Sequence, residues 1–369
     1  MAPSEQKIFN VGVVGYGMSA KVFHIPFIAT APAFRLHSIL QRNPTPESSA
    51  PEDHPGVKHF TSLEPFLADQ DLDVVVLTTT PETHFPFTEQ ALSANKHVFV
   101  EKPFVATAAE ADTLAELAQA RNRVLCVYQN RRWDSDFLTV RRLLAAGTLG
   151  RIYEFATHFD RYRATAPTTW KGRLPMSKGG SALYDLGTHL VDQAYVLFGM
   201  PQSVFAKLTN QRDGRVLGPD DPSVEPDSIN VQLFYAGGLT VHVRVGAMSA
   251  ETRQPRFWIR GTKGSYHKDG LDTQEDQLKA GMKTSDNQFG KDPEAWHGRL
   301  IRVGEDEQMS EETWPNVEPV TYSKIYELFA DSLRGAGPVP VPALEARDVL
   351  RILEAARESA MRRREIDLS

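Results

Sequence analysis

Two ionisable side chains in this sequence have a spacing that suits proton transfer to and from an alcohol oxygen. Asp185 and His189 lie four residues apart in a segment predicted to be helical, so they share one helical face, and Asp192 follows about one turn later. A histidine accepts a hydroxyl proton near neutral pH, and a carboxylate one turn away can fix its tautomer or bind a second hydroxyl. Taken alone, however, the segment favours a plainer interpretation, with an aspartate at a helix N-terminus and a histidine in the core.

Lys102 favours a catalytic interpretation of Asp185 and His189 over a structural one. It follows a predicted parallel strand in the string Glu101-Lys102-Pro103, where a proline-fixed turn holds a cation close to the strand end. A cation at that place can hydrogen-bond the reacting oxygen and favour its alkoxide-like state during hydride transfer. Lys102, Asp185 and His189 together would make a proton-handling set for oxidising a hydroxyl.

A glycine turn close to the N-terminus is suited to bind a dinucleotide. The strand-like run Val11–Val14 leads into a turn of the form G-x-G-x-x-A, in which Met18 and Ser19 separate the second glycine from the alanine. Gly15 allows the tight turn, Gly17 lets backbone amides approach a pyrophosphate, and Ala20 lets the next helix pack on the strand. The start of that helix adds N–H donors and partial positive charge.

The end of the second predicted strand indicates which dinucleotide is bound. NAD-binding folds usually have an acidic residue here, but residues 34–40 are followed by Gln41-Arg42-Asn43 and the first carboxylate is Glu47. A guanidinium can pair with a 2′-phosphate, which a carboxylate would repel. The pattern therefore favours NADP over NAD, with a solvated loop cation as the alternative interpretation of Arg42.

Short β-rich runs alternate with helical stretches up to about residue 130, which predicts βαβ units on a parallel sheet. We therefore expect residues 1–130 to form a Rossmann dinucleotide-binding domain. Polar residues follow three of the strands, and ligands of such sheets bind at the carboxyl ends of the strands. The residues expected to line the cofactor cleft on this ground include Thr79, Thr80, Glu101, Lys102 and Gln129.

Beyond residue 130 the pattern changes to longer alternating strands. We expect residues 131–369 to form a substrate-binding and oligomerisation α/β domain with a large, open, mostly antiparallel sheet. Residues 227–235 and 239–246 predict one hairpin, 257–260 and 265–267 another, and helices are expected near 181–198, 322–334 and 343–364. The polar stretches 213–226 and 282–319 are rich in glycine and proline and are expected to be surface loops.

The composition and the spacing of residue types disfavour several classes of protein. The chain has 369 residues and a formal net charge of −6, and no basic run interleaves with aromatic residues, so we expect no nucleic-acid partner. No apolar stretch approaches the ~18 residues of a membrane span, which disfavours membrane insertion. A single cysteine, Cys126, favours the cytoplasm. The histidines show no metal-ligand spacing, so a metal-dependent alcohol dehydrogenase is disfavoured.

Three motifs together make the whole chain resemble the Gfo/Idh/MocA oxidoreductase family. They are the glycine turn at 15–20, Glu101-Lys102-Pro103, and Gly179-Gly180 followed by Asp185-x-Gly187-x-His189. Within the family the chain is most similar to NADP-dependent scyllo-inositol dehydrogenases and their relatives. Three longer strings support this, at residues 15–24, 130–139 and 184–189.

The resemblance implies a site as well as a fold. It implies Lys102, Asp185 and His189 as the catalytic set, and a homodimer or homotetramer built through the open sheet. Trp170-Lys171 departs from the Trp-Arg of many relatives, which puts a cofactor contact of Trp170 in doubt. The implied cofactor cleft includes Thr79, Thr80, His84 and Glu101, and the implied substrate pocket includes Arg131, Trp133, Asp134, Asp160, Arg161 and Arg163. These pocket residues offer an aromatic stacking surface and several hydrogen bonds for a polyol, or alternatively a salt-bridged surface.

Three functions fit these observations. The first is an NADP-dependent dehydrogenase or reductase acting on a secondary alcohol or ketone of a cyclitol or sugar-like substrate. The second is a non-catalytic sugar sensor that binds dinucleotide and a partner protein, although such a module has no need of a proton-transfer set. The third is a related NAD-dependent glycosidase, whose members are typically longer and secreted.

Overall fold

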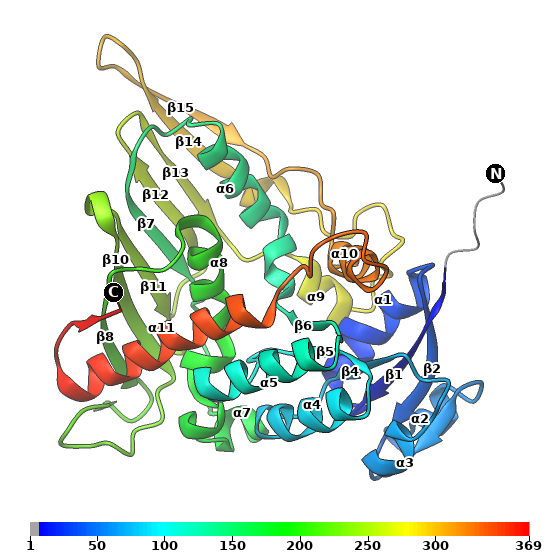
Figure 1. Ribbon diagram of the computed structural model, residues 1–369. Coiled ribbons are helices and arrows are strands. Elements are labelled where there is room, and N and C mark those ends of the chain that lie inside the picture. Colours follow the sequence, from blue (N-terminus) through cyan, green and yellow to red (C-terminus); the bar gives the residue numbers. More distant parts are fainter. Residues whose placement is uncertain (1–6, 369) are drawn as a thin grey trace. The chain divides into compact units, whose positions relative to one another are not determined.

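The computed structural model describes residues 7–368, which divide into two compact units (Figure 1). The first unit comprises the chain through Asn130, Asp276–Phe289 and Tyr322–Arg347, and the second comprises Arg131–Glu275, Gly290–Thr321 and the chain from Asp348. The predicted assignment of cofactor binding to residues 1–130 and of substrate binding and oligomerisation to 131–369 stays a prediction. Residues 1–6 and 369 of those ranges lie outside the described chain.

A six-stranded parallel sheet forms the centre of the first unit, in the order β3-β2-β1-β4-β5-β6. The sheet reverses direction of growth between β1 and β4, and ligands of such sheets bind at the carboxyl ends of the strands beside this switch point. The predicted Rossmann fold is thereby confirmed. The strands are β1 Phe9–Val14, β2 Phe34–Leu40, β3 Lys58–Phe60, β4 Val74–Leu77, β5 His97–Glu101 and β6 Leu125–Tyr128.

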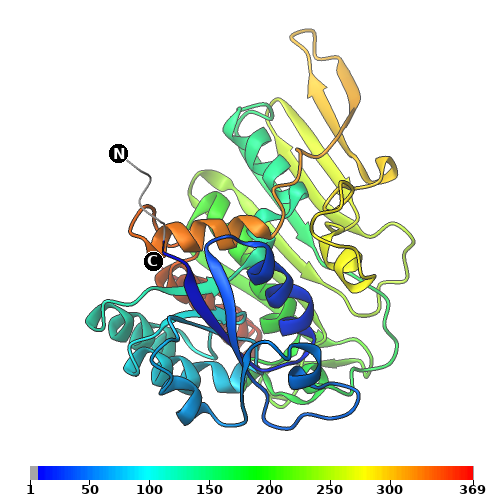
Figure 2. The same ribbon diagram turned by 90° about the vertical axis from the view of Figure 1, so that its right-hand side faces the viewer.

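Helices of the first unit pack on this sheet through aromatic side chains. The ring of Phe27 stacks on that of Tyr326 with centroids 5.8 Å apart, and Phe34 stacks on Phe329 at 5.9 Å. These contacts hold α10 against α1 and β2 (Figure 2). The helices are α1 Ile25–Thr30, α2 Ala50–Asp53, α3 Leu63–Leu67, α4 His84–Ser93, α5 Ala108–Ala120 and α10 Ser323–Leu333, and α9 Gln274–Lys279 begins in the second unit.

A large mixed sheet forms the second unit, in the order β15-β14-β13-β12-β7-β11-β10-β8-β16, with β9 paired to β8. Within this sheet, among residues 7–368, the β7–β11 pair is parallel and the other strand pairs are antiparallel, which confirms the predicted fold class and both hairpins. The strands are β7 Ile152–His158, β8 Ser203–Asn210, β9 Arg215–Val216, β10 Ser228–Phe234, β11 Thr240–Val245, β12 Pro255–Gly261, β13 Gly264–Asp269, β14 Gly298–Val303, β15 Met309–Trp314 and β16 Ile366–Asp367.

Two predicted loops contain strands, so the expectation for them was wrong. Residues 213–226 contain β9, and residues 282–319 contain the β14–β15 hairpin at the edge of the large sheet (Figure 1). No apolar alternation marks β15, because nearly all of its side chains are exposed. Main-chain pairing with β14 and cross-strand ion pairs, such as Arg302 to Glu312 at 2.9 Å, stabilise it instead.

Helices cover one face of the large sheet and leave the other open. Along β11, Val241, Val243 and Val245 are buried, whereas His242 and Arg244 between them are partly or fully exposed. Figure 1 shows α6 and α8 lying against one face. The helices are α6 Ser135–Ala145, α7 Trp170–Arg173, α8 Thr188–Phe198 and α11 Ala343–Arg362, the last beginning in the first unit.

Candidate active site

The glycine turn after β1 has the geometry of a phosphate cradle. Gly15 has a φ of +96° and donates its N–H to the Leu40 carbonyl at 2.9 Å, and a Cβ there would lie 2.9 Å from Thr78 Oγ1. At Gly17, by contrast, an added Cβ would meet nothing within 4 Å. The first glycine is therefore required by the turn itself, and the second leaves open space over the backbone. That difference fits the close approach of a dinucleotide pyrophosphate.

The carboxylate of Glu101 ties the glycine turn to the lysine turn after β5. It accepts hydrogen bonds from the Ser19 hydroxyl and, at 3.0 Å, from the Lys102 N–H, and His24 Nε2 lies 3.1 Å away. Tyr326 extends this chain, with its hydroxyl 2.7 Å from His24 Nδ1. Burial opposes ionisation of Glu101, but His24, Lys102 and Ser19 outweigh it and lower its pKa. An ionised Glu101 thus holds the main chain of Lys102 in place, and the Lys102–Pro103 peptide bond is cis.

His84 connects two strand ends from a fully buried position. Its Nδ1 lies 2.8 Å from the Pro103 carbonyl and its Nε2 lies 3.1 Å from the Thr79 carbonyl. Burial lowers the pKa of His84 by more than the hydrogen bonds with the Pro103 and Thr79 carbonyls raise it. The side chain therefore links the turn after β4, which carries Thr79 and Thr80, to the turn that carries Lys102. Gln129, the remaining predicted strand-end residue, follows β6 and is buried.

The residues that follow β2 divide into a structural amide and an exposed cation. Gln41 donates its amide N–H to the Ser48 carbonyl and accepts from the Ala50 N–H, both at 2.7 Å. Arg42 is exposed and makes no ion pair with any residue in the range 7–368. The Tyr16 hydroxyl donates to Asp53 at 2.7 Å. Gln41 is thus used to shape the loop, and Arg42 is available to an anion.

Asp185 and His189 lie at a junction between two kinds of helix in the second unit. Residues Leu183–Gly187 form a π-helical turn that continues into α8, where a regular helix was predicted, and π-turns are frequent at functional sites. Asp185 is 6% exposed and His189 is 4% exposed. Lys171 places its Nζ 2.9 and 3.0 Å from the two carboxylate oxygens of Asp185. The residue that departs from the pattern of many relatives is therefore an ion-pair partner of Asp185.

Gly180 holds the short helix α7, which carries Lys171, close to the start of the helical segment that carries Asp185. A Cβ at Gly180 would lie 1.8 Å from the Leu174 carbonyl oxygen, so no larger residue fits there. The Gly180 N–H donates to the Pro175 carbonyl at 3.1 Å. Trp170 is half-buried, and the Lys171 ammonium lies 5.4 Å from the centre of its ring. Gly180 thus brings the 170–175 backbone to within reach of Asp185.

The predicted substrate residues that follow β6 are buried in ion pairs. Arg131 Nη1 lies 3.2 Å from Asp134 Oδ2 and also pairs with Glu275, and Trp133 is 8% exposed. Burial and neighbouring carboxylates raise the pKa of Asp134 well above its ordinary value. Asp192, the second acid on the predicted face, is held by both arms of Arg132, at 2.7 and 2.9 Å. A salt-bridged surface was the alternative interpretation of these residues, but the individual partners and their burial were not predicted from the sequence.

A cavity of about 160 Å³ opens beside Asp185, within the second unit. The segment that follows β7 lines it, because the N–H groups of Arg161 and Arg163 donate to the Gly246 and Ala247 carbonyls at 2.9 and 2.8 Å. Asp160 is buried behind this segment, with Oδ2 3.0 Å from His158 Nδ1. The charged side chains that line the cavity are Arg161, Arg163, Lys171, Arg173, Arg212, Asp185, Glu225 and Asp227.

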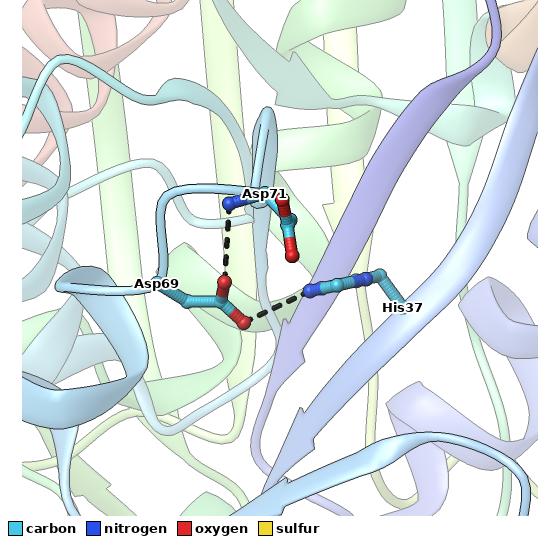
Figure 3. Close-up of side chains that lie close together, drawn as sticks. All are labelled: His37, Asp69 and Asp71. Atoms are coloured by element: carbon cyan, nitrogen blue, oxygen red, sulfur yellow. Dashed lines mark hydrogen bonds and ion pairs between the residues drawn. The ribbon is translucent and has the colours of Figure 1, made fainter.

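One cluster among residues 7–368 has metal-ligand spacing, and it is far better described as an ion-pair cluster. His37, Asp69 and Asp71 place a ligand atom each within 4.8 Å of one another (Figure 3). The Lys58 ammonium lies 2.9 Å from Asp69 and 3.2 Å from Asp71, so it pairs with the carboxylates that a metal ion would need. Burial opposes ionisation of Asp69, but Lys58, His37 and the Asp71 N–H lower its pKa to about 2.

Comparison with known families agrees with these features. Residues 9–129 match the NAD-binding Rossmann fold of an oxidoreductase family, and residues 141–368 match the C-terminal alpha/beta domain of the same family. The chain therefore belongs to the Gfo/Idh/MocA oxidoreductases and has an NAD(P)-binding fold, as its motifs predicted. In residues 7–368 no helix combines the length and the apolar character that crossing a membrane requires.

Individual relatives match over almost their whole length. The chain is 38% identical to the uncharacterised oxidoreductase YdgJ of Escherichia coli (strain K12), covering 96% of this chain and 97% of that protein. It is 34% identical to IolW of Bacillus subtilis (strain 168), a scyllo-inositol 2-dehydrogenase (NADP⁺), covering 97% and 96%. A solved oxidoreductase structure from Bacillus subtilis, YvaA, superimposes with a TM-score of 0.87 at 34% identity, covering 98% of this chain and all of that one.

Proposed function

We propose that this protein is an NADP-preferring oxidoreductase acting on a secondary alcohol, or the matching ketone, of a cyclitol or sugar-like substrate. The observation that carries the proposal is that Asp185 is buried one turn before a buried His189 and that both of its carboxylate oxygens accept hydrogen bonds from Lys171. Burying a carboxylate and a histidine costs free energy unless polar partners compensate it, and such buried titratable groups concentrate at catalytic sites. A relative at 34% identity, IolW, is named as a dehydrogenase of this kind.

Each residue of the set has a distinct role in the proposal. His189 accepts the hydroxyl proton in oxidation and returns it in reduction, and Asp185 orients His189 or a neighbouring substrate hydroxyl. Lys102, whose main chain Glu101 holds, donates a hydrogen bond to the reacting oxygen and stabilises its developing charge. When bound, NADP accepts the hydride and NADPH supplies it.

The preference for NADP rests on the surroundings of Arg42. It is an exposed guanidinium directly after β2, and Gln41 stands where an NAD-binding fold would offer an acid. A guanidinium binds a 2′-phosphate through two parallel hydrogen bonds. The residues proposed to hold the rest of the dinucleotide are Gly15, Gly17, Met18, Ser19, Ala20, Thr79, Thr80, His84, Glu101, Lys102, Gln129 and Trp170.

We also propose that copies of the chain associate through the open face of the large sheet, as a cytoplasmic homodimer or homotetramer. Phe205 on β8 and Trp258 on β12 are each 40% exposed, which is unusual for such large apolar side chains in the middle of strands. Sedimentation velocity tests this, because Trp258→Arg should shift the protein towards the monomer. An unchanged assembly would remove that face from the interface.

A substrate panel tests the activity. Purified protein is mixed with NADP or NAD and a set of inositols and aldoses, and with NADPH and the matching ketones, while the near-ultraviolet absorbance of NADPH is followed. Turnover should fall by orders of magnitude in Lys102→Met and in His189→Ala, and NADPH affinity should stay close to wild type in His189→Ala. His297→Ala is the matched control, because His297 is a half-buried histidine on a loop before β14. Unchanged turnover in the first two variants would remove those residues from the mechanism, and dinucleotide binding without any turnover would favour the sensor.

A further inference from the structure

The cavity beside Asp185 has an excess of positive charge. We infer that it binds an anionic group of the substrate, a carboxylate or a phosphate. The inference rests on the proposed function, because it concerns the same molecule whose hydroxyl or ketone reacts. It narrows the substrate class from neutral polyols to sugar acids or sugar phosphates.

Ion pairing within the cavity accounts for two of its cations. Lys171 is paired with Asp185, and Arg212 is paired with Asp227 at 2.6 Å. Arg161, Arg163 and Arg173 have no carboxylate within ion-pair distance among the residues that the structure describes. Three guanidinium groups therefore line one small cavity without a carboxylate at ion-pair distance, although Asp185 in the same lining partly offsets the charge of Arg161.

The remaining carboxylate of the cavity does little to offset that charge. Glu225 is exposed to solvent and accepts a hydrogen bond from the Met176 N–H at 2.8 Å, so its charge is screened and is directed at the backbone. Partial burial also raises the pKa of Glu225. Because the whole chain has a formal net charge of −6, this positive cavity is a local feature and no reflection of overall composition.

The backbone fixes two of these arginines in one direction. Arg161 and Arg163 are two residues apart in an extended segment that is hydrogen-bonded to the residues just after β11, so their side chains leave the same side of it. Tyr162 between them is 58% exposed. The Arg161 guanidinium lies 5.5 Å from the centre of the Phe159 ring, which restricts it further. The Arg161 guanidinium is thereby preorganised for an oxyanion, with Arg163 on the same side of the segment, and guanidinium groups can only donate hydrogen bonds.

The charges also repel each other in the absence of an anion. Burial, Arg163 and Arg131 lower the pKa of Arg161 by more than Asp185 and Glu275 raise it, which means that its positive charge is disfavoured where it lies. A bound carboxylate or phosphate would relieve that repulsion. The cavity is smaller than the ~300–1,000 Å³ of pockets for drug-sized ligands, so it suits a compact metabolite. Asp185 lines the same cavity, which brings the anionic end close to the proposed catalytic carboxylate.

Calorimetry with three matched probes tests the inference without requiring turnover. Glucose, glucuronate and glucose 6-phosphate are titrated into the full-length protein, with and without saturating NADP. At least one anionic probe should bind ten times or more as tightly as glucose, and whichever binds identifies the carboxylate or the phosphate as the preferred group. Losing one guanidinium contact should weaken that probe roughly tenfold to a hundredfold in Arg161→Met and in Arg163→Met.

Matched variants and the cofactor decide between the remaining explanations. Arg163 is exposed, so Arg163→Met keeps the test valid if the more buried Arg161→Met is poorly folded. Arg299→Met, an exposed arginine on β14, should leave binding of the probes unchanged. The inference is overturned if glucose binds as tightly as the charged probes, if no probe binds up to millimolar concentration, or if both cavity variants bind like wild type. It is also overturned if NADP displaces the anionic probe and both variants lose as much affinity for NADP as for the probe. In that case the arginines would bind the cofactor and not the substrate. Binding of an anion by a protein that never turns over would keep the cavity's role and reject the proposed function.

Discussion

Replacing each glycine of the first turn by alanine makes the same chemical change at two positions with opposite consequences. Gly15 has a φ of +96°, and a Cβ there would lie 2.9 Å from Thr78 Oγ1. A non-glycine residue in this conformation costs about 1–3 kcal/mol, so Gly15→Ala should lower Tm by several degrees. At Gly17 a Cβ has no neighbour within 4 Å, and alanine there should leave stability unchanged or raise it by up to ~1 kcal/mol.

NADPH affinity should depend on the two glycines in the opposite order, with the larger loss in Gly17→Ala. If the open space at Gly17 is where the pyrophosphate approaches, a methyl group costs the equivalent of one charged hydrogen bond, about 1.5–3 kcal/mol. NADPH should therefore bind Gly17→Ala roughly tenfold to a hundredfold more weakly by calorimetry, in a protein whose thermal unfolding is as stable as wild type. Wild-type affinity in Gly17→Ala, or a loss of Tm equal to that of Gly15→Ala, would refute the assignment of this turn as the cofactor cradle.

Three other changes probe separate parts of the structure. Lys171→Met should lower kcat/KM about tenfold to a hundredfold, because it removes the ion pair between Lys171 and the carboxylate of Asp185. Lys171→Arg keeps the charge and should retain most activity. An equal loss of kcat/KM in both variants would contradict a role for the charge. Arg42→Ala should weaken NADPH by about 1–3 kcal/mol in a fluorescence titration and leave NADH unaffected, and a matching loss for NADH would argue against recognition of the 2′-phosphate. Burial and Arg123 lower the pKa of His97 to about 4, and its Nδ1 accepts a hydrogen bond from the Val124 N–H. Stability that is present at neutral pH is therefore lost as pH falls from ~6.5 towards 4, by ~2 kcal/mol after allowance for partial exposure. His97→Asn should flatten this dependence of stability on pH. Urea unfolding across that range measures it, and parallel curves for wild type and variant would rule out His97 as the source.

Local sequence patterns were sufficient to predict the architecture. The parallel sheet follows from apolar runs separated by helical stretches, and β4 is buried along its entire length as such a sheet requires. The glycine turn and the polar strand ends could be placed because the carboxyl ends of parallel strands meet at one edge. The β14–β15 hairpin could not, because exposed strands held by main-chain pairing lack an apolar period.

The proposed site is less visible in the sequence, because its supporting contacts are long-range. Glu101, His24 and Tyr326 form one hydrogen-bonded chain, although Tyr326 is 302 residues from His24. Lys171 reaches Asp185 across a loop whose path depends on the close backbone approach at Gly180. The π-turn at Leu183–Gly187 has no distinct residue preference that would separate it from a regular helix. Residue type indicated Glu101 and Asp185 as functional groups, but only the fold shows their partners.

Isotope transfer tests the central proposal most directly. Protein and a ketone substrate from the panel are incubated with NADPH that carries deuterium at C4 of the nicotinamide, on each face in turn, and the product is analysed by mass spectrometry. Direct hydride transfer predicts that one of the two labelled forms places deuterium on the carbinol carbon, and that His189→Ala forms almost no labelled product. Alcohol product without deuterium from either form, or labelled product at the wild-type rate in His189→Ala, would contradict the proposed mechanism.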